Sequence, residues 1–407
     1  MKLRRHWLWM VLIWLAVWLI AYLLLYREWD YAERWLILSG ATLAAISWRV
    51  WKNLGLNYRS EEGHLLPTFG PGNQISLARG LLLGLLAGFL FSPWPSGALA
   101  WIIAGLYTMA SIADAFDGYA ARRSNQVTEF GQWLDMEFDG LGMAIVTLLA
   151  VGYGQLPYWF LAVGFARYAF VFGLWWRERS GKPNYEIPAS THRRILAGML
   201  MGMMTVVLWP IVPPAMSQVA AAVIGIPVLL GFLRDWLFAS GRLNSSNQAY
   251  QRRRRFIARL LTRWLPPVWR FLLPGAMFGI LSAAEPWYRP GAWEALIQSW
   301  GLPGAAALAS LMALTAVTGT ILVALGILGR LWAILLLLPI GFDISTRGLT
   351  WANGLALVCA LMVTLFGSGP YSIWRPEEAF MVHRGGHDDN ETLEANNQTT
   401  HEPAATI

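Results

Sequence analysis

The sequence predicts an all-α protein that crosses a membrane about twelve times. Of its 407 residues, 56% are apolar and only 14% are charged, which is about half the charged share of soluble domains. The apolar residues also gather in runs that approach the roughly 20 residues a membrane-spanning helix needs. Together these observations exclude an ordinary soluble domain.

The apolar runs fall into three groups, which predict two N-terminal helices, a six-helix core and a C-terminal four-helix bundle. The first run is too long for a signal peptide and lacks a small-residue cleavage site, so we expect it to remain as a span. The predicted spans are 7–26 and 33–51, then 74–92, 98–120, 134–153, 157–176, 194–212 and 215–238, and finally 268–284, 303–326, 331–345 and 350–367.

Positive charge marks one side of this arrangement. Arginine and lysine cluster at the N-terminus and in the segments 49–73, 121–133, 177–194 and 239–267, whereas the loops on the other side carry almost none. By the positive-inside rule, these clusters lie in the cytoplasm. We therefore predict an integral protein of a bacterial inner membrane, with the active site and both termini on the cytoplasmic side.

Composition further divides the chain into five expected segments. They are two N-terminal helices (1–66), the six-helix core (67–240), a basic linker (241–267), the four-helix bundle (268–380) and a tail (381–407). The linker contains RRRRFIARLLTR and no acidic residue, so we expect it to contact anionic membrane lipids rather than nucleic acid. The tail is nearly devoid of apolar residues and should be disordered.

Four aspartates interrupt this apolar pattern at the ends of two neighbouring spans. Asp114 and Asp117 are three residues apart, and Asp135 and Asp139 are four apart, so each pair lies on one face of a helix. One pair ends a span and the other begins the next span on the same membrane side. A helical hairpin would bring all four carboxylates to one depth.

Such a cluster needs cations. Unpaired carboxylates repel one another, and ionisable groups within spans are functional-site candidates. The neighbouring Arg122 and Arg123 cannot neutralise four of them. Divalent cations can, because Mg²⁺ and Mn²⁺ prefer hard oxygen ligands, and two metals about 3.5–4 Å apart form a clamp for phosphoryl displacement. The alternative is a set of interfacial acids that mark span ends.

The residues between the two pairs complete the pattern D-x2-D-G-x2-A-R-x8-G-x3-D-x3-D. This pattern resembles the signature of the CDP-alcohol phosphatidyltransferases at every position, and the six-span core of that family corresponds to about 70–240 here. The stretch GNQISLARGLL is also similar to the family's opening motif. Asn73 and Arg79 are in place there, with Gly72 and Ser76 where proline and threonine are usual.

The resemblance implies a mechanism and a set of residues. A phosphatidyl or other phospho-alcohol group would move from a CDP-linked donor, expected to be CDP-diacylglycerol, to an alcohol hydroxyl, releasing CMP in phospholipid biosynthesis. Two divalent cations, Mg²⁺ or Mn²⁺, would be held by the aspartates, and Asp139 would also act as general base. The implied metal ligands are Asp114, Asp117, Asp135 and Asp139, and the implied CDP-binding residues are Gly118, Ala121, Arg122 and Gly131.

The acceptor pocket is less defined. Arg167 lies inside a span, and Arg193 and Arg194 lie in a basic loop, so all three are candidates for binding a phosphate or polar headgroup. For Arg193 and Arg194, the general excess of positive charge in cytoplasmic loops is an equally good explanation. For Arg167, the alternative to substrate binding is a structural ion pair with one of the aspartates. A second copy of the chain is a further expected partner.

The C-terminal part lies outside the transferase resemblance. Its ending, LFGSGPYSIWRPEE, is similar to the close of the last helix in DoxX-like membrane proteins, which implies an interaction or scaffold module. The ionisable residues Glu285, Glu294, Asp343 and Arg347 lie in or near predicted loops, so we expect them to be solvated. The single cysteine, Cys359, excludes a disulfide within the chain and indicates packing.

Two other function classes remain open from the residues alone. A cation transporter could use the acidic cluster, but it would need polar groups near the membrane midplane on several spans. A transferase core without activity could serve as a scaffold, although all four aspartates are present.

Overall fold

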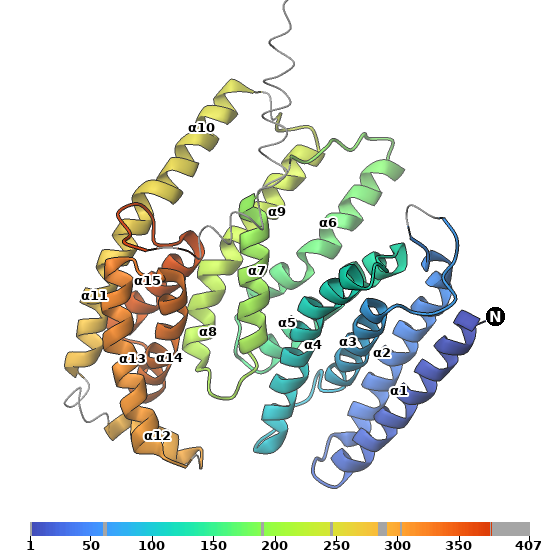
Figure 1. The fold of residues 1–407 in the computed structure, drawn as a ribbon, viewed down its shortest axis with the longest axis horizontal. Coiled ribbons are helices and arrows are strands. Elements are labelled where there is room, and N and C mark those ends of the chain that lie inside the picture. The colour runs from blue at the N-terminus through green and yellow to red at the C-terminus, as the bar shows by residue number, and fades with distance from the viewer. Residues whose placement is uncertain are drawn as a thin grey trace, which may run out of the picture. The chain divides into compact units, whose positions relative to one another are not determined.

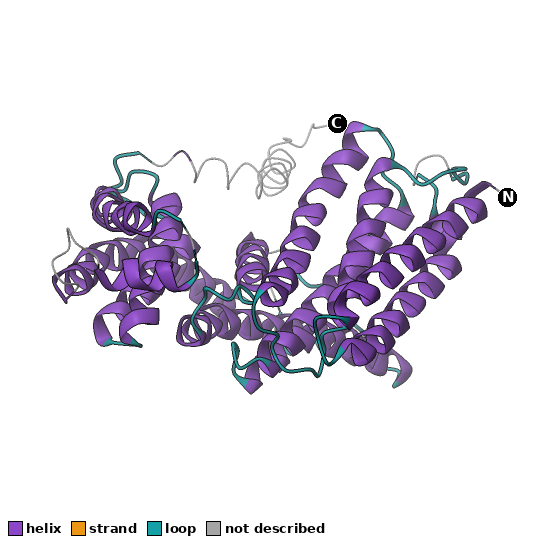
Figure 2. Cartoon of the chain, turned by 90° about the horizontal axis from the view of Figure 1, so that it is seen from below, coloured by secondary structure: helices purple, strands orange, loops and turns teal. Residues whose placement is uncertain are grey.

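The computed structural model describes residues 2–59, 63–188, 191–244, 247–283, 291–301 and 303–374, together with residue 376. Within these residues the chain forms helices, turns and isolated bridges but no strand, as Figure 2 shows. The predicted all-α class is therefore confirmed. The tail 381–407 and Glu285 lie outside the described residues.

The helices follow the predicted order along the chain (Figure 1). They are α1 (Lys2–Tyr26), α2 (Ala32–Asn53), α3 (Pro71–Ala87), α4 (Ala98–Arg123), α5 (Glu129–Gly152), α6 (Leu161–Arg179), α7 (Thr191–Val206), α8 (Pro214–Ala220), α9 (Ile226–Ala239), α10 (Gln248–Arg259), α11 (Leu265–Ala283), α12 (Gly291–Ser299), α13 (Ala305–Leu325), α14 (Gly329–Arg347) and α15 (Trp351–Phe366). π-Helical turns at Ala221–Gly225 and Leu260–Trp264 connect α8 to α9 and α10 to α11.

A helix lies at each predicted span, and six helical segments in the described residues are long and apolar enough to cross a membrane. These are Lys2–Tyr26, Ala98–Arg123, Tyr158–Arg179, Pro214–Ala239, Ala305–Leu325 and Gly329–Arg347. Other helices at predicted spans are shorter. The helix α3 has 17 residues and is therefore roughly 25 Å long, whereas the hydrocarbon core of a bilayer is about 30 Å thick. A membrane protein is supported, while the number of twelve spans stays a prediction.

The chain divides into two compact units, which we describe separately. The first contains residues 1–181 and 200–221, and the second contains residues 182–199 and 222–407. The five segments expected from the sequence stay a prediction.

In the first unit, indole hydrogen bonds pair α1 with α2 in antiparallel register. Trp7 Nε1 donates to the Ser47 carbonyl at 3.2 Å, and Trp18 Nε1 donates to Ser39 Oγ at 2.9 Å. The residue numbers therefore rise along α1 as they fall along α2, as in an antiparallel pair. On the next face, the buried Trp35 of α2 donates to the Leu85 carbonyl of α3 at 3.0 Å. Each indole thus satisfies its N–H while its ring covers apolar surface.

The helix α3 lies against α2, α4 and α5 and is the centre of this unit. Its residue Gly80 shows why the approach to α5 is close: a Cβ there would lie 2.6 Å from the Phe138 ring. Only glycine leaves room for that ring. The end of α7 is attached to α4, because Thr205 Oγ1 donates to Ser111 Oγ at 3.1 Å. These contacts hold α3, α4 and α5 in a fixed relative position.

In the second unit, buried Arg270 of α11 closes the turn that follows α15. Its guanidinium donates to the Ser368 carbonyl at 3.0 Å, to Ser372 Oγ at 2.8 Å and to the Tyr371 carbonyl at 3.2 Å. The glycine-containing turn that carries the DoxX-like resemblance therefore has a physical role here: it presents carbonyl oxygens to a buried cation. The bundle itself, as a DoxX-like module, stays a prediction.

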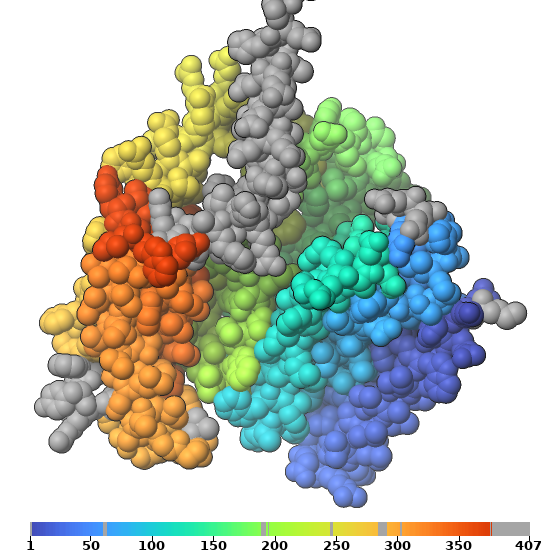
Figure 3. All heavy atoms as spheres, viewed as in Figure 1, coloured from blue at the N-terminus to red at the C-terminus, as the bar shows by residue number. Residues whose placement is uncertain are grey.

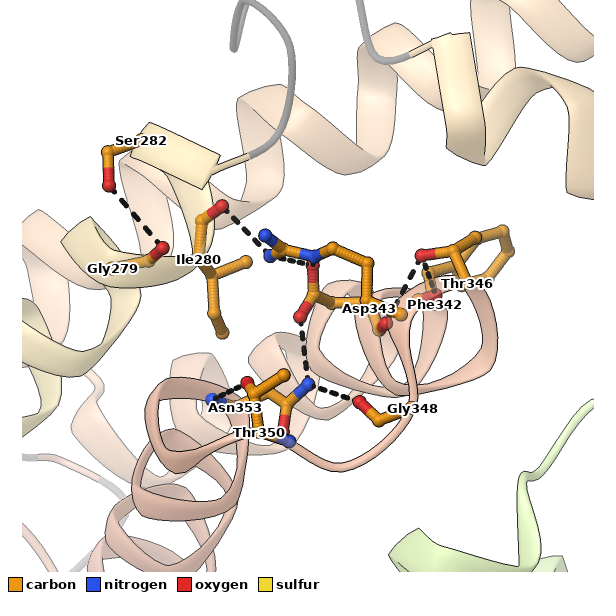
Figure 4. A network of polar contacts seen from close by, with 10 residues as sticks. Gly279, Ile280, Ser282, Phe342, Asp343, Thr346, Gly348, Thr350 and Asn353 are labelled. Atoms are coloured by element: carbon orange, nitrogen blue, oxygen red, sulfur yellow. Dashed lines mark hydrogen bonds and ion pairs between the residues drawn. The ribbon is translucent and has the colours of Figure 1, made fainter.

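A second polar network joins α11, α14 and α15 (Figure 4). Asp343 is fully buried and forms an ion pair with Arg347, one helical turn further on. The other Asp343 oxygen accepts from Asn353 Nδ2 at 3.0 Å, and Arg347 also donates to the Ile280 carbonyl at 3.1 Å. The expectation that Asp343 and Arg347 are solvated is wrong. The ion pair lies within α14, and the remaining partners, Asn353 and the Ile280 carbonyl, come from the two other helices that meet at this end.

Of the other residues in that expectation, Glu294 lies on the short helix α12. It accepts a hydrogen bond from Gln298 Nε2 at 3.1 Å in an exposed position. Its carboxylate therefore keeps contact with solvent.

We expect Asp343→Ala to destabilise the protein by about 3 kcal/mol, since removing one partner leaves Arg347 without its counter-charge. Thermal unfolding in detergent measures this as a lowered midpoint. Glu294→Ala is the matched control, because it removes an exposed carboxylate with a single hydrogen bond, and its effect should stay within about 0.5 kcal/mol. Equal midpoints for the two variants would contradict the structural role of the network.

Candidate active site

The predicted helical hairpin is present. The helix α4 continues through Asp114 and Asp117 to Arg123, and α5 begins at Glu129 after a short turn. Thr128 caps α5, since its hydroxyl oxygen accepts from the Gly131 N–H at 3.0 Å. Such a cap satisfies a backbone donor that the first helical turn leaves open. The cap fixes where α5 starts and so sets the register of the second aspartate pair.

Three of the four carboxylates meet. One oxygen each from Asp114, Asp135 and Asp139 lies within 4.8 Å of the others. Asp114 comes from α4, and the other two lie one turn apart on α5. Asp135 is the most open, with 53% of its side chain exposed against 26% for each of the others. The group is therefore reachable from solvent at one edge.

Asp117 stands apart from this group of three. It is buried, and one of its oxygens accepts from Ser76 Oγ of α3 at 2.7 Å. Ser76 is the residue at the threonine position of the opening motif, so a hydroxyl there has a defined use. The structure thus brings all four aspartates to the interface of α3, α4 and α5, with three of them in one cluster.

Arg79 supplies the positive charge inside the cluster. Only 5% of the residue is exposed, and its guanidinium forms ion pairs with Asp114 and Asp139 and lies 3.6 Å from an Asp135 oxygen. Arginine suits this position, because its planar fork binds two carboxylates at once. Three carboxylates and one guanidinium leave two negative charges unbalanced.

The donor set fits a divalent cation. The cluster offers carboxylate oxygens, which are the ligands that Mg²⁺ and Mn²⁺ prefer, and its remaining charge is that of one such ion. Asp114, Asp135 and Asp139 are the described residues whose oxygens come close enough to share an ion. Asp117 is adjacent on the next turn of α4 and could complete a second site.

An amide network attaches the start of α3 to the start of α5. Buried Asn73 donates through Nδ2 to Asn57 Oδ1 and to Thr128 Oγ1, both at 3.1 Å. Sequence reasoning identified Asn73 only through the opening motif and missed Asn57 and Thr128. The signal for Thr128 was its place three residues before Gly131, at the start of an apolar helix, which is typical of a cap.

The residues expected to line the CDP site divide into two kinds. A Cβ at Gly131 would lie 2.6 Å from Asn73 Oδ1, and a Cβ at Gly72 would lie 2.7 Å from the Ala121 side chain. Gly131 and Ala121 therefore allow close packing against α3. Gly118 lies beneath the exposed Arg122, whose Nη1 would be 3.1 Å from an added Cβ. Their contact with CDP stays a prediction.

The acceptor candidates have different surroundings. Arg167 is half-buried on α6 and, within the described residues, makes no ion pair with the four aspartates. Arg193 of α7 instead pairs with the buried Asp235 of α9, Nη1 to Oδ2, at 2.8 Å. Asp235 was not anticipated. The Arg194 side chain lies outside the described residues, although its backbone is part of α7.

Comparison with known proteins identifies the family of this segment. Residues 71–248 match the family model described as CDP-alcohol phosphatidyltransferase. The chain is 33% identical over 116 residues to the CDP-diacylglycerol–glycerol-3-phosphate 3-phosphatidyltransferase of Bacillus subtilis (strain 168), a match that covers 26% of this chain and 60% of the relative. The chain thus spans less than two thirds of that relative. No solved structure matches. The family resemblance seen in the motif is confirmed for residues 71–248.

We expect Arg79→Gln to destabilise the metal-free protein by about 2 kcal/mol, which is less than the roughly 3–5 kcal/mol for breaking a fully buried ion pair, because the carboxylates keep some solvent contact. Added Mn²⁺ should then raise the unfolding midpoint more in the variant than in the wild type, since the cation replaces a charge that Arg79 otherwise supplies. Thermal unfolding with and without Mn²⁺ measures both effects.

The control for this prediction is Arg49→Gln. Arg49 pairs with Glu137 at 2.7 Å, but its side chain is 55% exposed, so the loss should remain below about 1 kcal/mol. An Mn²⁺ response of Arg79→Gln equal to that of this control would contradict the placement of Arg79 in the cluster.

Proposed function

We propose that this protein is an integral-membrane phosphotransferase, because residues 71–248 match the family model of the CDP-alcohol phosphatidyltransferases. It moves a phosphatidyl or other phospho-alcohol group from a CDP-linked donor to an alcohol hydroxyl and releases CMP. The observation that carries the proposal is the meeting of Asp114, Asp135 and Asp139 within 4.8 Å in the segment that holds the full signature.

The proposed ligands for two divalent cations are Asp114, Asp117, Asp135 and Asp139. When bound, the cations would neutralise the diphosphate of the donor and the charge that develops on it. The aspartates come from two helices held by α3, so their positions are set before substrate arrives. Such preorganisation lowers the reorganisation that the reaction requires.

Asp139 is the proposed general base. It takes the proton from the acceptor hydroxyl as that oxygen forms a bond to the phosphorus bearing the alcohol. The bond from this phosphorus to the bridging oxygen breaks, and CMP leaves with the electron pair. Arg79 forms an ion pair with Asp139 and so holds the carboxylate in place.

The donor and acceptor are narrower parts of the proposal. The name of the Bacillus subtilis relative specifies CDP-diacylglycerol and glycerol 3-phosphate, which supports CDP-diacylglycerol as the donor here. The proposed lining residues for CDP are Gly118, Ala121, Arg122 and Gly131. Arg167 is the stronger acceptor candidate of the three arginines, because Arg193 is already paired with Asp235.

The proposed location is a bacterial inner membrane, with the site and both termini in the cytoplasm, where a CDP-linked donor is available. Anionic lipids and a second copy of the chain are proposed partners. The positive-inside pattern of the loops supports this orientation.

We expect metal-dependent CMP release from the purified protein in detergent with CDP-diacylglycerol and one alcohol of a panel that includes glycerol 3-phosphate. Asp139→Asn should reduce the rate by about 100-fold or more, because a general base contributes 10²–10⁴-fold. Asp30→Asn is the control, since this exposed aspartate lies in the turn between α1 and α2 and its loss should leave the rate unchanged.

Unreduced CMP release by Asp139→Asn would exclude the proposed base. Absence of release with every acceptor would exclude CDP-diacylglycerol as the donor, and absence of CDP binding would favour the scaffold function instead.

We also expect EDTA to abolish CMP release and Mg²⁺ or Mn²⁺ to restore it. Electron paramagnetic resonance of bound Mn²⁺ gives a readout independent of activity. The wild type should bind Mn²⁺ at the cluster, and Asp135→Asn should weaken this binding by at least tenfold, because one charged oxygen ligand becomes a neutral amide. Equal Mn²⁺ affinity in both proteins would place the ion elsewhere.

A further inference from the structure

The helix α10 is exposed along its length. None of its residues is buried, and only Tyr250 and Ala258 are half-buried. Large apolar side chains are open to the surroundings: Phe256 is 64% exposed and Ile257 is 52% exposed. Figure 3 shows the atoms of this segment, in yellow, at the surface. A helix in water would not leave these side chains uncovered without a cost in free energy.

The same segment is strongly basic. Residues 252–263 contain six arginines and no acidic residue. On an α-helix with 100° per residue, Arg252, Arg255 and Arg259 share one face, because their spacing is three and four. Ile257 lies on the opposite side, about 40° from Arg253 and about 60° from Arg254, and Phe256 lies about 40° from Arg252. The helix is therefore amphipathic, with one wholly polar side and an opposite side on which the apolar Ile257 lies between Arg253 and Arg254.

Its position along the chain places it at a membrane boundary. Eight residues, 240–247, separate the end of the candidate span Pro214–Ala239 from the start of α10. Tyr250 meets Phe238, in the last turn of that span, with ring centroids 5.3 Å apart. Asn247 caps α10, as its Oδ1 accepts from the Ala249 N–H at 2.9 Å. The first turn of α10 thus starts beside the end of a span rather than at a distance from it.

From these observations we propose that α10 is an interfacial helix that binds anionic lipid headgroups. Arg252, Arg255 and Arg259 contact the headgroups, and Ile257 and its apolar neighbours enter the acyl boundary. Helices with a basic face and an apolar face lie in the plane of such a surface. This goes beyond a linker that merely rests on charge, and it does not depend on the transferase activity.

An anionic bilayer is favoured over a nucleic acid by the apolar side of the helix. A polynucleotide would satisfy the arginines but leave Phe256 and Ile257 in water. An anionic membrane satisfies both faces at once, and each arginine near its surface contributes roughly fivefold to the ratio of bound to free helix.

The test uses the full chain with Cys359→Ala, since Cys359 is the only cysteine. A nitroxide label is placed at Ile257→Cys or, as the matched position on the opposite face, at Gln248→Cys. The protein is reconstituted in vesicles of phosphatidylcholine alone or in vesicles that also contain about 30% phosphatidylglycerol. The anionic lipid gives the second kind of vesicle a negative surface. Collision of each label with oxygen and with a nickel chelate reports its depth.

In anionic vesicles, we expect the ratio of the collision rate with oxygen to that with the chelate to be at least about fivefold higher for the label at position 257 than for the label at position 248. The difference should shrink in phosphatidylcholine and in 1 M salt, where the Debye length is about 3 Å. Replacing Arg252, Arg255 and Arg259 together by glutamine should reduce it, whereas replacement by lysine should retain it.

Equal, water-like collision rates at positions 257 and 248 in anionic vesicles would overturn the proposal. So would the same depth in both vesicle types, since anionic headgroups would then have no part in binding. Displacement of the helix from anionic vesicles by a short oligonucleotide at equal charge concentration would identify nucleic acid as the better partner and would also overturn it.

Discussion

The ion pairs of Arg79 with Asp114 and Asp139 are the interaction on which the packing of α3, α4 and α5 in the first unit depends. Carboxylates on two neighbouring helices repel each other wherever solvent is scarce, so α4 and α5 can bring theirs together only if a cation lies between them. Arg79 of α3 provides that cation from a third helix. The packing of α3 against α4 and α5 therefore also neutralises part of the charge of the aspartates, because α3 carries the Arg79 guanidinium.

The packing of α3 against its neighbours depends both on small residues and on polar side chains. Gly80 accepts the Phe138 ring against its backbone, and Gly131 leaves room for the Asn73 amide. Ser76 and Asn73 then bind Asp117 and Thr128. Two residues that the family resemblance assigns to the CDP site, Ala121 and Gly131, also take part in this packing. Their small size serves the closeness of the helices whether or not a nucleotide is bound.

The second unit also contains a carboxylate between helices, but this carboxylate is closed off from solvent. Asp343 is fully buried, and its two oxygens are occupied by Arg347 and Asn353. No charge is left over for a ligand, in contrast to the cluster around Arg79, where two negative charges remain and Asp135 faces solvent. The difference separates an ionic network that holds helices together from one that can receive a divalent cation.

The sequence by itself determined the helical class, the approximate place of the helices at the predicted spans and the four aspartates, but it did not indicate α10 or α12. Apolar runs and fixed motif spacing depend only on local periodicity, which the sequence carries directly. The tertiary structure alone decided which groups meet: Arg79 inside the cluster, Asp117 on Ser76, and Arg193 on Asp235. It also overturned the expected solvation of Asp343 and Arg347. Partners from distant helices cannot be recognised from the sequence, because a side chain's surroundings depend on how three helices are rotated and seated against one another.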